Sequence, residues 1–209
     1  MLHYQTIDAG TLELLRKLQG SSGFENLRLV GGTGLALQYG HRKSVDIDLF
    51  GNITIDGIEM AKKLNQTGTA IQLKKSENIN IYLLDNIKVD IVNYPYPWLN
   101  EPVNEDGLVL AHKEDIAAMK LSAITGRGSK KDFIDLYFLL QEYKLQQLLS
   151  FYQLKYHDGS MFLVIKSLGY FDDADSDESP VMLEPTNWET VKDTITAALN
   201  DYLTHQALA

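Results

Sequence analysis

The feature that most constrains this chain is a short run in which apolar and acidic residues alternate, residues 45–50 (VDIDLF). Successive side chains of a β-strand point to opposite faces, so this period of two predicts a half-buried strand. Asp46 and Asp48 then share one face of the strand, and the apolar residues between them cover the other face. The sequence therefore predicts a sheet that carries two neighbouring carboxylates.

A glycine-rich turn lies upstream of this strand. Residues 27–30 form a short apolar run that breaks on Gly31 and Gly32, and residues 33–39 have the character of a helix. Backbone N–H groups at such a strand-to-helix turn can approach a phosphate closely, and the helix start attracts negative charge. The pattern is neither a P-loop nor the GxGxxG dinucleotide fingerprint. The turn is a candidate phosphate cradle; the alternative is that its glycines serve only the tight turn.

A third acid follows on a later strand, where Asp90 alternates with Val89 and Ile91. Neighbouring carboxylates raise each other's pKa, so such a set is unfavourable unless a cation neutralises it. Mg²⁺ and Mn²⁺ prefer oxygen ligands, and a third carboxylate could complete a two-metal site for phosphoryl or nucleotidyl transfer. The alternative is that the acids are solvated on an exposed strand face.

The remaining sequence separates into a strand-rich part and a helical part. Further strands are expected at residues 70–74, 79–84 and 87–93, with a tight turn at Asp85-Asn86. After a proline-bearing segment the patterns are helical, at residues 113–125, 131–143, 145–155, 160–168 and 187–206. Thr186 and Glu189 have the spacing of a capping box for the last helix. We therefore predict an α+β fold with a sheet core in residues 1–110 and a helical region in residues 111–209.

Composition excludes several classes of protein. The 209 residues contain no cysteine, which excludes disulfide frameworks, cysteine nucleophiles and thiolate metal sites. The five histidines form no i, i+4 metal pair, and the serines lack a nucleophile-elbow context, so zinc and hydrolase chemistry have no support. No run of about 18 apolar residues occurs. We expect a soluble cytoplasmic protein that does not bind membranes.

Charge is distributed unevenly along the chain. The net charge is -9, but residues 1–150 carry 16 basic and 18 acidic groups, whereas residues 151–209 carry 3 basic and 10 acidic groups. The part with the candidate site is therefore close to neutral. We interpret the acidic end, including residues 172–178, either as a contact for a basic partner or as a surface that keeps RNA oriented toward the metal face.

Several motifs occur together in one order: residues 31–37 (GGTGLAL), residues 40–50 (GHRKSVDIDLF), residues 88–97 (KVDIVNYPYP), residues 115–121 (DIAAMKL) and residues 127–136 (RGSKKDFIDL). Over roughly residues 27–142 this order resembles the AbiEii/AbiGii-type nucleotidyltransferases, a branch of the DNA polymerase beta-like superfamily. The resemblance implies a mixed β-sheet nucleotidyltransferase core flanked by helices and followed by a helical region. It also implies an NTP substrate, Mg²⁺ and the toxin half of a toxin–antitoxin or abortive-infection system.

The resemblance assigns roles to particular residues. The catalytic set is Asp46, Asp48, Asp90, Lys120 and Asp132. The metal ligands are Asp46, Asp48 and Asp90. The nucleotide-binding set is Gly31, Gly32, Thr33, Arg42, Ser44, Lys120 and Lys131.

The residues themselves leave alternatives for the helical part. Lys120 shares a helix face with apolar residues, which suits either an anion contact or an aliphatic stem that snorkels to water. Asp132 could be favoured by a helix start, and Asp135 could pair with Lys131. Five basic residues could form a strip for RNA, or merely balance nearby acids: Lys113, Lys120, Arg127, Lys130 and Lys131.

Two functional hypotheses follow. The first is a Mg²⁺-dependent enzyme, with Mn²⁺ as an alternative ion, that moves an NMP from an NTP to an acceptor hydroxyl. A tRNA end is the acceptor favoured by the resemblance, with a protein hydroxyl or a small molecule as alternatives, and a cognate antitoxin protein is the expected partner. The second hypothesis is a non-catalytic interaction protein on the same fold, and the presence of all three acids argues against it.

Overall fold

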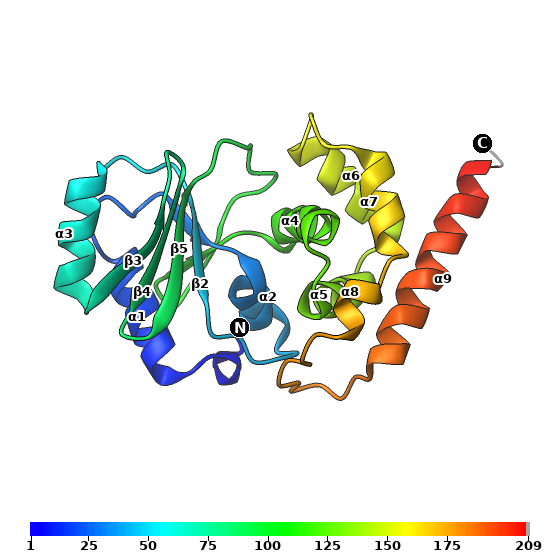
Figure 1. Ribbon diagram of the computed structural model, residues 1–209, viewed down its shortest axis with the longest axis horizontal. Coiled ribbons are helices and arrows are strands. Elements are labelled where there is room, and N and C mark those ends of the chain that lie inside the picture. The colour runs from blue at the N-terminus through cyan, green and yellow to red at the C-terminus, as the bar shows by residue number, and fades with distance from the viewer. Residues whose placement is uncertain (208–209) are drawn as a thin grey trace. The chain divides into compact units, whose positions relative to one another are not determined.

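A computed structural model describes residues 1–207. Contacts divide the chain into two compact units (Figure 1). The sheet unit contains residues 1–96 and 101–112, and the helical unit contains residues 97–100 and the chain from Lys113 onward. Residues 97–100 therefore pack with the helices, although they lie between two strands in the sequence.

The sheet unit is built on a seven-stranded sheet in the described residues, with the order β3-β4-β5-β2-β1-β7-β6. Its strands are β1 (Leu27–Leu29), β2 (Ile47–Gly51), β3 (Ala70–Lys75), β4 (Ile79–Leu84), β5 (Ile87–Asn93), β6 (Val103–Glu105) and β7 (Leu108–Leu110). The pairs β2–β5 and β1–β7 are parallel, and the other neighbours are antiparallel. The mixed sheet confirms the predicted α+β class.

Two tight turns close hairpins in this sheet. Asp85 and Asn86, with φ of 47° and 68°, join β4 to β5. Asp106 and Gly107, with φ of 53° and 78°, join β6 to β7. Positive φ at both central residues is the conformation that suits the twist of a two-residue hairpin, and Asp, Asn and Gly tolerate it best. The first turn was predicted; β6 and β7 were not, because strands of three residues are too short to show a period.

Three α-helices lie around these strands: α1 (Ala9–Gln19), α2 (Gly31–Tyr39) and α3 (Gly57–Thr67), preceded by a 3-10 turn, Tyr4–Thr6 (Figure 1). Their apolar faces and the apolar side of the sheet form one core. Ile47, Leu49, Val89 and Ile91 are fully buried in it. The acidic residues that alternate with them are consequently held on the opposite face of β2 and β5.

The helical unit contains α4 (Lys113–Gly126), α5 (Lys130–Leu140), α6 (Leu145–Lys155), α7 (Met161–Leu168), α8 (Asp172–Asp175) and α9 (Trp188–Ala207). Helix α4 packs against α5, α6 and α7, and α9 packs against α5. The capping box predicted for α9 is wrong, because the Asn187 side chain accepts the Thr190 N–H at 2.7 Å and caps the helix one residue later. Within residues 1–207, no helix is both long and apolar enough to cross a bilayer.

A buried ion pair fastens residues 97–100 to α4 and α6. Asp115 accepts the N–H groups of Leu99 and Asn100 at 2.9 and 3.2 Å. The Lys155 ammonium lies 2.7 Å from Asp115 Oδ1 and 4.6 Å from the centre of the Trp98 ring. Both charged side chains are fully buried, so the charge of each is stabilised by the other and by these hydrogen bonds.

Candidate functional site

The sheet brings the predicted acids together. Asp48 on β2 and Asp90 on β5 are register partners in a parallel pair. Strands that pair in this way lie about 4.8 Å apart, and register partners project from the same face. Asp46 lies immediately before β2, two residues from Asp48. Asp48 and Asp90 thus lie on neighbouring strands, on the faces that their alternation with buried apolar residues predicted, and the pairing of the two strands comes from the structure.

Gly31 lies directly against one of these acids. Its φ is 65°, in the left-handed region, and a Cβ on it would lie 2.0 Å from Asp48 Oδ2. The N–H of Val30, the residue before Gly31, donates a hydrogen bond of 2.9 Å to the Asp48 carbonyl. Glycine is therefore required here for both conformation and space, and the Asp48 carboxylate lies at the N-terminus of α2.

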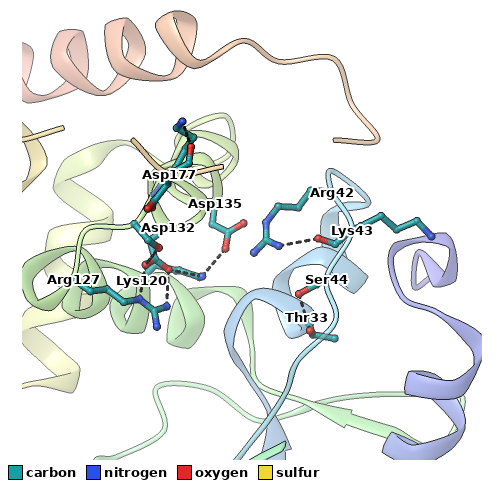
Figure 2. A network of polar contacts seen from close by, with 11 residues as sticks. Thr33, Arg42, Lys43, Ser44, Lys120, Arg127, Asp132, Asp135 and Asp177 are labelled. Atoms are coloured by element: carbon teal, nitrogen blue, oxygen red, sulfur yellow. Dashed lines mark hydrogen bonds and ion pairs between the residues drawn. The ribbon is translucent and has the colours of Figure 1, made fainter. Parts of the chain in front are cut away.

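A guanidinium lies at the same helix end. A Cβ on Gly32 would lie 2.4 Å from Arg42 Nη2 and 3.4 Å from Ser44 Oγ. Arg42 is buried, and its Nη1 donates to the Lys43 carbonyl at 3.0 Å (Figure 2). The helix dipole and the guanidinium both contribute positive potential at the start of α2. This place consequently favours an anion.

The hydroxyl of Thr33 ties α2 to the chain that carries Asp46. Thr33 Oγ1 donates to the Asp46 carbonyl and lies 2.8 Å from Ser44 Oγ (Figure 2). A carbonyl only accepts and a threonine hydroxyl has one proton, so Ser44 must be the donor in the second bond. Thr33 is also fully buried. The two hydroxyls therefore hold the acid strand against α2.

Lys88 lies among the three acids, and the sequence interpretation did not single it out. Its Nζ is 2.7 Å from Asp90 Oδ1. Burial lowers the pKa of Lys88. The carboxylates of Asp90, Asp48 and Asp46 together raise this pKa by more than burial lowers it, so it lies above the ordinary value. The signal was present in the sequence, because Lys88 and Asp90 are two apart on a strand and share a face.

The acids suit a divalent cation by their chemistry. They offer oxygen ligands, which Mg²⁺ and Mn²⁺ prefer. Asp90 Oδ1 is buried, and in the described residues it has no hydrogen-bond partner apart from the Lys88 ammonium. In the described part of the chain, no three acidic or histidine side chains already have the arrangement of a metal site. The fit of these residues to a divalent ion is therefore one of ligand chemistry, with the Lys88 ammonium beside Asp90 in this structure.

In the helical unit, Lys120 and Asp132 belong to a closed cluster of charges. The Lys120 ammonium lies 3.0 Å from Asp132 Oδ1 and 2.5 Å from Asp135 Oδ2. Arg127 binds both oxygens of Asp132, at 2.8 and 3.1 Å, and Ser129 Oγ donates to it at 2.6 Å (Figure 2). Asp135 is ion-paired with Lys120 of α4, and not with Lys131 as the alternative had it.

These contacts fix the ionisation of Asp132. Burial alone would raise its pKa, but the charge of Lys120, the Arg127 guanidinium and the Ser129 hydroxyl together hold the pKa well below its usual range. Lys120, Asp132 and Asp135 are all buried. Asp132 is therefore ionised at neutral pH, and its carboxylate is shielded from water.

The prediction that these basic residues form an exposed positive strip on the helices is wrong. Lys113 pairs with Glu142 at 2.5 Å, Lys120 and Arg127 are paired with buried acids, and Lys130 is buried. The charges of the strip are thus largely neutralised within the unit, which favours the interpretation that they balance neighbouring acids. Lys131 is exposed.

The acidic segment is partly committed to internal contacts. The Asp177 side chain accepts the Lys130 N–H at 2.9 Å, and Lys130 Nζ contacts the carbonyls of Asp175 and Asp177. Asp175 also accepts a hydrogen bond of 2.6 Å from Trp188 Nε1 and pairs with Lys192 at 3.2 Å. The short helix α8 lies within residues 172–178. The contacts of Asp175 and Asp177 anchor this segment to α5 and α9.

The fold is that of nucleotidyltransferases. A putative nucleotidyltransferase from Helicobacter pylori has a TM-score of 0.62 at 19% identity, over 96% of this chain and 97% of that one. MenT4, a nucleotidyltransferase toxin from Mycobacterium tuberculosis, has a TM-score of 0.60 at 14% identity, over 91% of this chain and 82% of that one. An uncharacterized protein of Aquifex aeolicus is 36% identical over 197 residues, which are 91% of this chain and 95% of the relative.

The family follows from a match over nearly the whole chain. Residues 13–208 match the family described as nucleotidyl transferase AbiEii toxin, type IV toxin–antitoxin system, and the chain belongs to this family. It is accordingly a nucleotidyltransferase of the toxin–antitoxin class, with an NTP as substrate and an antitoxin as partner. The resemblance predicted from its motifs is confirmed.

Proposed function

We propose that this protein transfers an NMP from an NTP to an acceptor hydroxyl with the help of Mg²⁺ or Mn²⁺ held by Asp46, Asp48 and Asp90. The observation that carries the proposal is the register of Asp48 with Asp90 beside the N-terminus of α2. This register gathers oxygen ligands for a divalent ion next to a place that favours phosphate.

The N-terminus of α2 is proposed to hold the triphosphate. The backbone N–H groups of Gly31, Gly32 and Thr33 lie in the first turn of the helix, where N–H groups lack partners inside the helix. Arg42 would contribute a bidentate contact to the same phosphates. The Ser44 hydroxyl could donate to a phosphate only by giving up its bond to Thr33, so its first role is to position this turn.

The chemical step then follows from the position of the acids. The acceptor oxygen attacks the α-phosphorus, the bond from this phosphorus to the α,β-bridging oxygen breaks, and pyrophosphate leaves. Asp90 would accept the proton of the acceptor hydroxyl. When bound, the divalent ion would neutralise the carboxylates and the charge that develops on the phosphate oxygens. Arg42 and the turn at Gly31 would keep the triphosphate in line for this attack.

The residues of the helical unit are proposed to act mainly by positioning. Lys120 and Asp132 are buried in ion pairs. This burial favours a role in holding the helices rigid over a direct contact with phosphate. Lys131 is exposed, and we propose that it contacts nucleotide phosphates. Their assignment to catalysis and nucleotide binding remains a prediction, and loss of activity without loss of stability in Lys131→Met would support it.

The acceptor is proposed to be a tRNA end, with a protein hydroxyl or a small molecule as the other outcomes of the test. The neutralised lysines of α4 and α5 give this choice no support from surface charge, so it depends on the resemblance alone. We also assign the protein to the cytoplasm, where NTPs and tRNA are available.

Incorporation of label from α-³²P NTPs, each nucleotide in turn, tests the proposal. Purified protein would be incubated with Mg²⁺, Mn²⁺ or EDTA, and with tRNA, cell protein or small-molecule extract as acceptor. We expect label on one acceptor class only when metal is present. Asp48→Asn and Asp90→Asn should reduce transfer by on the order of 10²-fold or more. Glu77→Gln, an exposed change on the same sheet unit, is the matched control. Transfer by Asp48→Asn at the rate of the parent would overturn the proposal.

A further inference from the structure

The position of Lys88 gives the acid cluster a cation of its own. Ile47 pairs with Val89 and Asp48 pairs with Asp90, so continuing this register by one residue brings Lys88 beside Asp46. Asp90 lies two residues away on the same strand and face. The ammonium is 2.7 Å from Asp90 Oδ1, and all three carboxylates stabilise its charge. Lys88 therefore occupies the region where a divalent ion would be held.

The two side chains of this ion pair differ in exposure, and the buried atom is the carboxylate oxygen. The Asp90 side chain is 19% exposed, whereas that of Lys88 is 41% exposed. Apart from the Lys88 ammonium, Asp90 Oδ1 has no hydrogen-bond partner in the described residues, so this ammonium compensates the buried oxygen. The lysine can move into water, but the carboxylate oxygen needs a cation wherever the lysine goes.

We propose that Lys88 is a displaceable counter-cation, which compensates the acid cluster before the metal binds and leaves Asp90 when the metal nucleotide arrives. The inference rests on the proposed function, because it takes Asp90 as a metal ligand. Lys88 is a positioning residue in this account, since it acts through the carboxylates and not on the reacting atoms.

The consequence is a coupling between metal and nucleotide. A free divalent ion has to displace the ammonium and then remain beside a like charge, which opposes binding. A metal nucleotide brings phosphate oxygens that can accept the displaced ammonium. Lys88 therefore lowers the affinity for free metal more than the affinity for metal nucleotide.

Mn²⁺ binding to the full-length protein tests this coupling without requiring turnover. Free and bound Mn²⁺ would be measured by EPR, with and without a non-hydrolysable NTP, for the parent, Lys88→Met, Lys88→Arg and Lys74→Met. We expect Lys88→Met to bind free Mn²⁺ about threefold to fivefold more tightly. This change in affinity corresponds to the interaction energy of a partly exposed ion pair. The nucleotide should then improve Mn²⁺ affinity less than it does in the parent.

The two controls make this result specific. Lys88→Arg keeps the charge and should retain weak binding of free Mn²⁺, and Lys74→Met removes an exposed lysine from β3 and should change nothing. Unchanged or weaker Mn²⁺ binding by Lys88→Met would overturn the inference. If Asp90→Asn abolishes Mn²⁺ binding while Lys88→Met leaves it unchanged, only the inference fails. If Asp90→Asn has no effect on Mn²⁺ binding, the proposed function fails with it.

Discussion

The sheet unit and the helical unit each contain a cluster of lysine and aspartate side chains, and the two clusters are built differently. Around Asp90, one ammonium on a side chain that is 41% exposed compensates several acids. Around Asp132, Lys120, Arg127 and Ser129 satisfy a carboxylate that is fully buried. The Lys88 ammonium can exchange with solvent, whereas Lys120, whose side chain is 5% exposed, is held between Asp132 and Asp135; in the second cluster it is the Arg127 side chain that reaches solvent.

The difference teaches how the same residue types serve two purposes. A buried ion pair that loses one partner leaves an uncompensated charge, so such a cluster holds one geometry. A partly exposed ion pair contributes little to the free energy of unfolding, so breaking it costs little free energy. We infer that the cluster of the helical unit supports structure, and that the cluster of the sheet unit is available for a ligand.

The largest effect is expected from Lys120→Met. This change leaves Asp132 and Asp135 buried without their shared cation, and should lower the free energy of unfolding by about 3–5 kcal/mol. Urea unfolding followed by circular dichroism measures it. Lys131→Met, an exposed change on the neighbouring helix, should stay within about 0.5 kcal/mol. Equal stabilities for these two variants would remove the distinction between the clusters.

Gly31→Ala should have the next largest effect, because it crowds the sheet-unit cluster from the side of α2. The added Cβ meets Asp48 Oδ2 in a backbone conformation that alanine disfavours, which should cost about 1–3 kcal/mol. Gly126→Ala is the matched control, since nothing lies within 4 Å of its added Cβ. The thermal unfolding midpoint should fall for the first variant and not for the second; a midpoint equal to the parent's for Gly31→Ala would contradict the close approach.

The pH dependence of stability should report the helical-unit cluster. The pKa of Asp132 is held below its unfolded value, so its contribution to stability is present above the unfolded pKa and is lost as pH falls toward the folded one. The parent should therefore lose stability from about pH 5 downward. Asp132→Asn should be less stable at pH 7 and show a shallower decline in urea titrations at successive pH values. An equally steep decline in the variant would assign the acid sensitivity to other groups.

Lys88→Met should have the smallest effect on stability. Solvent screens its ion pair, and we expect a change within about 1 kcal/mol at neutral pH. Urea unfolding in parallel with Lys120→Met gives the comparison directly. A loss as large as that of Lys120→Met would mean that Lys88 is a structural residue and not an exchangeable one.

Much of the fold could be predicted from patterns with a clear period. The strands at 79–84 and 87–93 and the helix at 145–155 lie where alternation or helical spacing indicated, because each is long enough to show its period. The strands β6 and β7 escaped prediction because three residues show no period; β1 is equally short, but the glycines that follow its apolar run mark its end. The start of α9 was misplaced because Thr186 and Asn187 are both good caps and only the backbone decides between them.

The candidate site divides in the same way. The shared face of Asp48 and Asp90 could be predicted because their strands alternate, although only the structure gives their register. The burial of Lys120 between Asp132 and Asp135 could not, since it depends on how α4 and α5 pack. Lys88 was within reach of the strand pattern, but a lysine in that position is usually a solvated neighbour of an acid.

A crystal of the protein soaked with Mn²⁺ and a non-hydrolysable NTP tests the central claim most directly. Anomalous scattering would locate the metal independently of any activity. We predict a Mn²⁺ peak ligated by Asp48 and Asp90, with the triphosphate at the N-terminus of α2 and the Lys88 ammonium moved away from Asp90. A peak at another place, or Lys88 still paired with Asp90 beside a bound nucleotide, would contradict it.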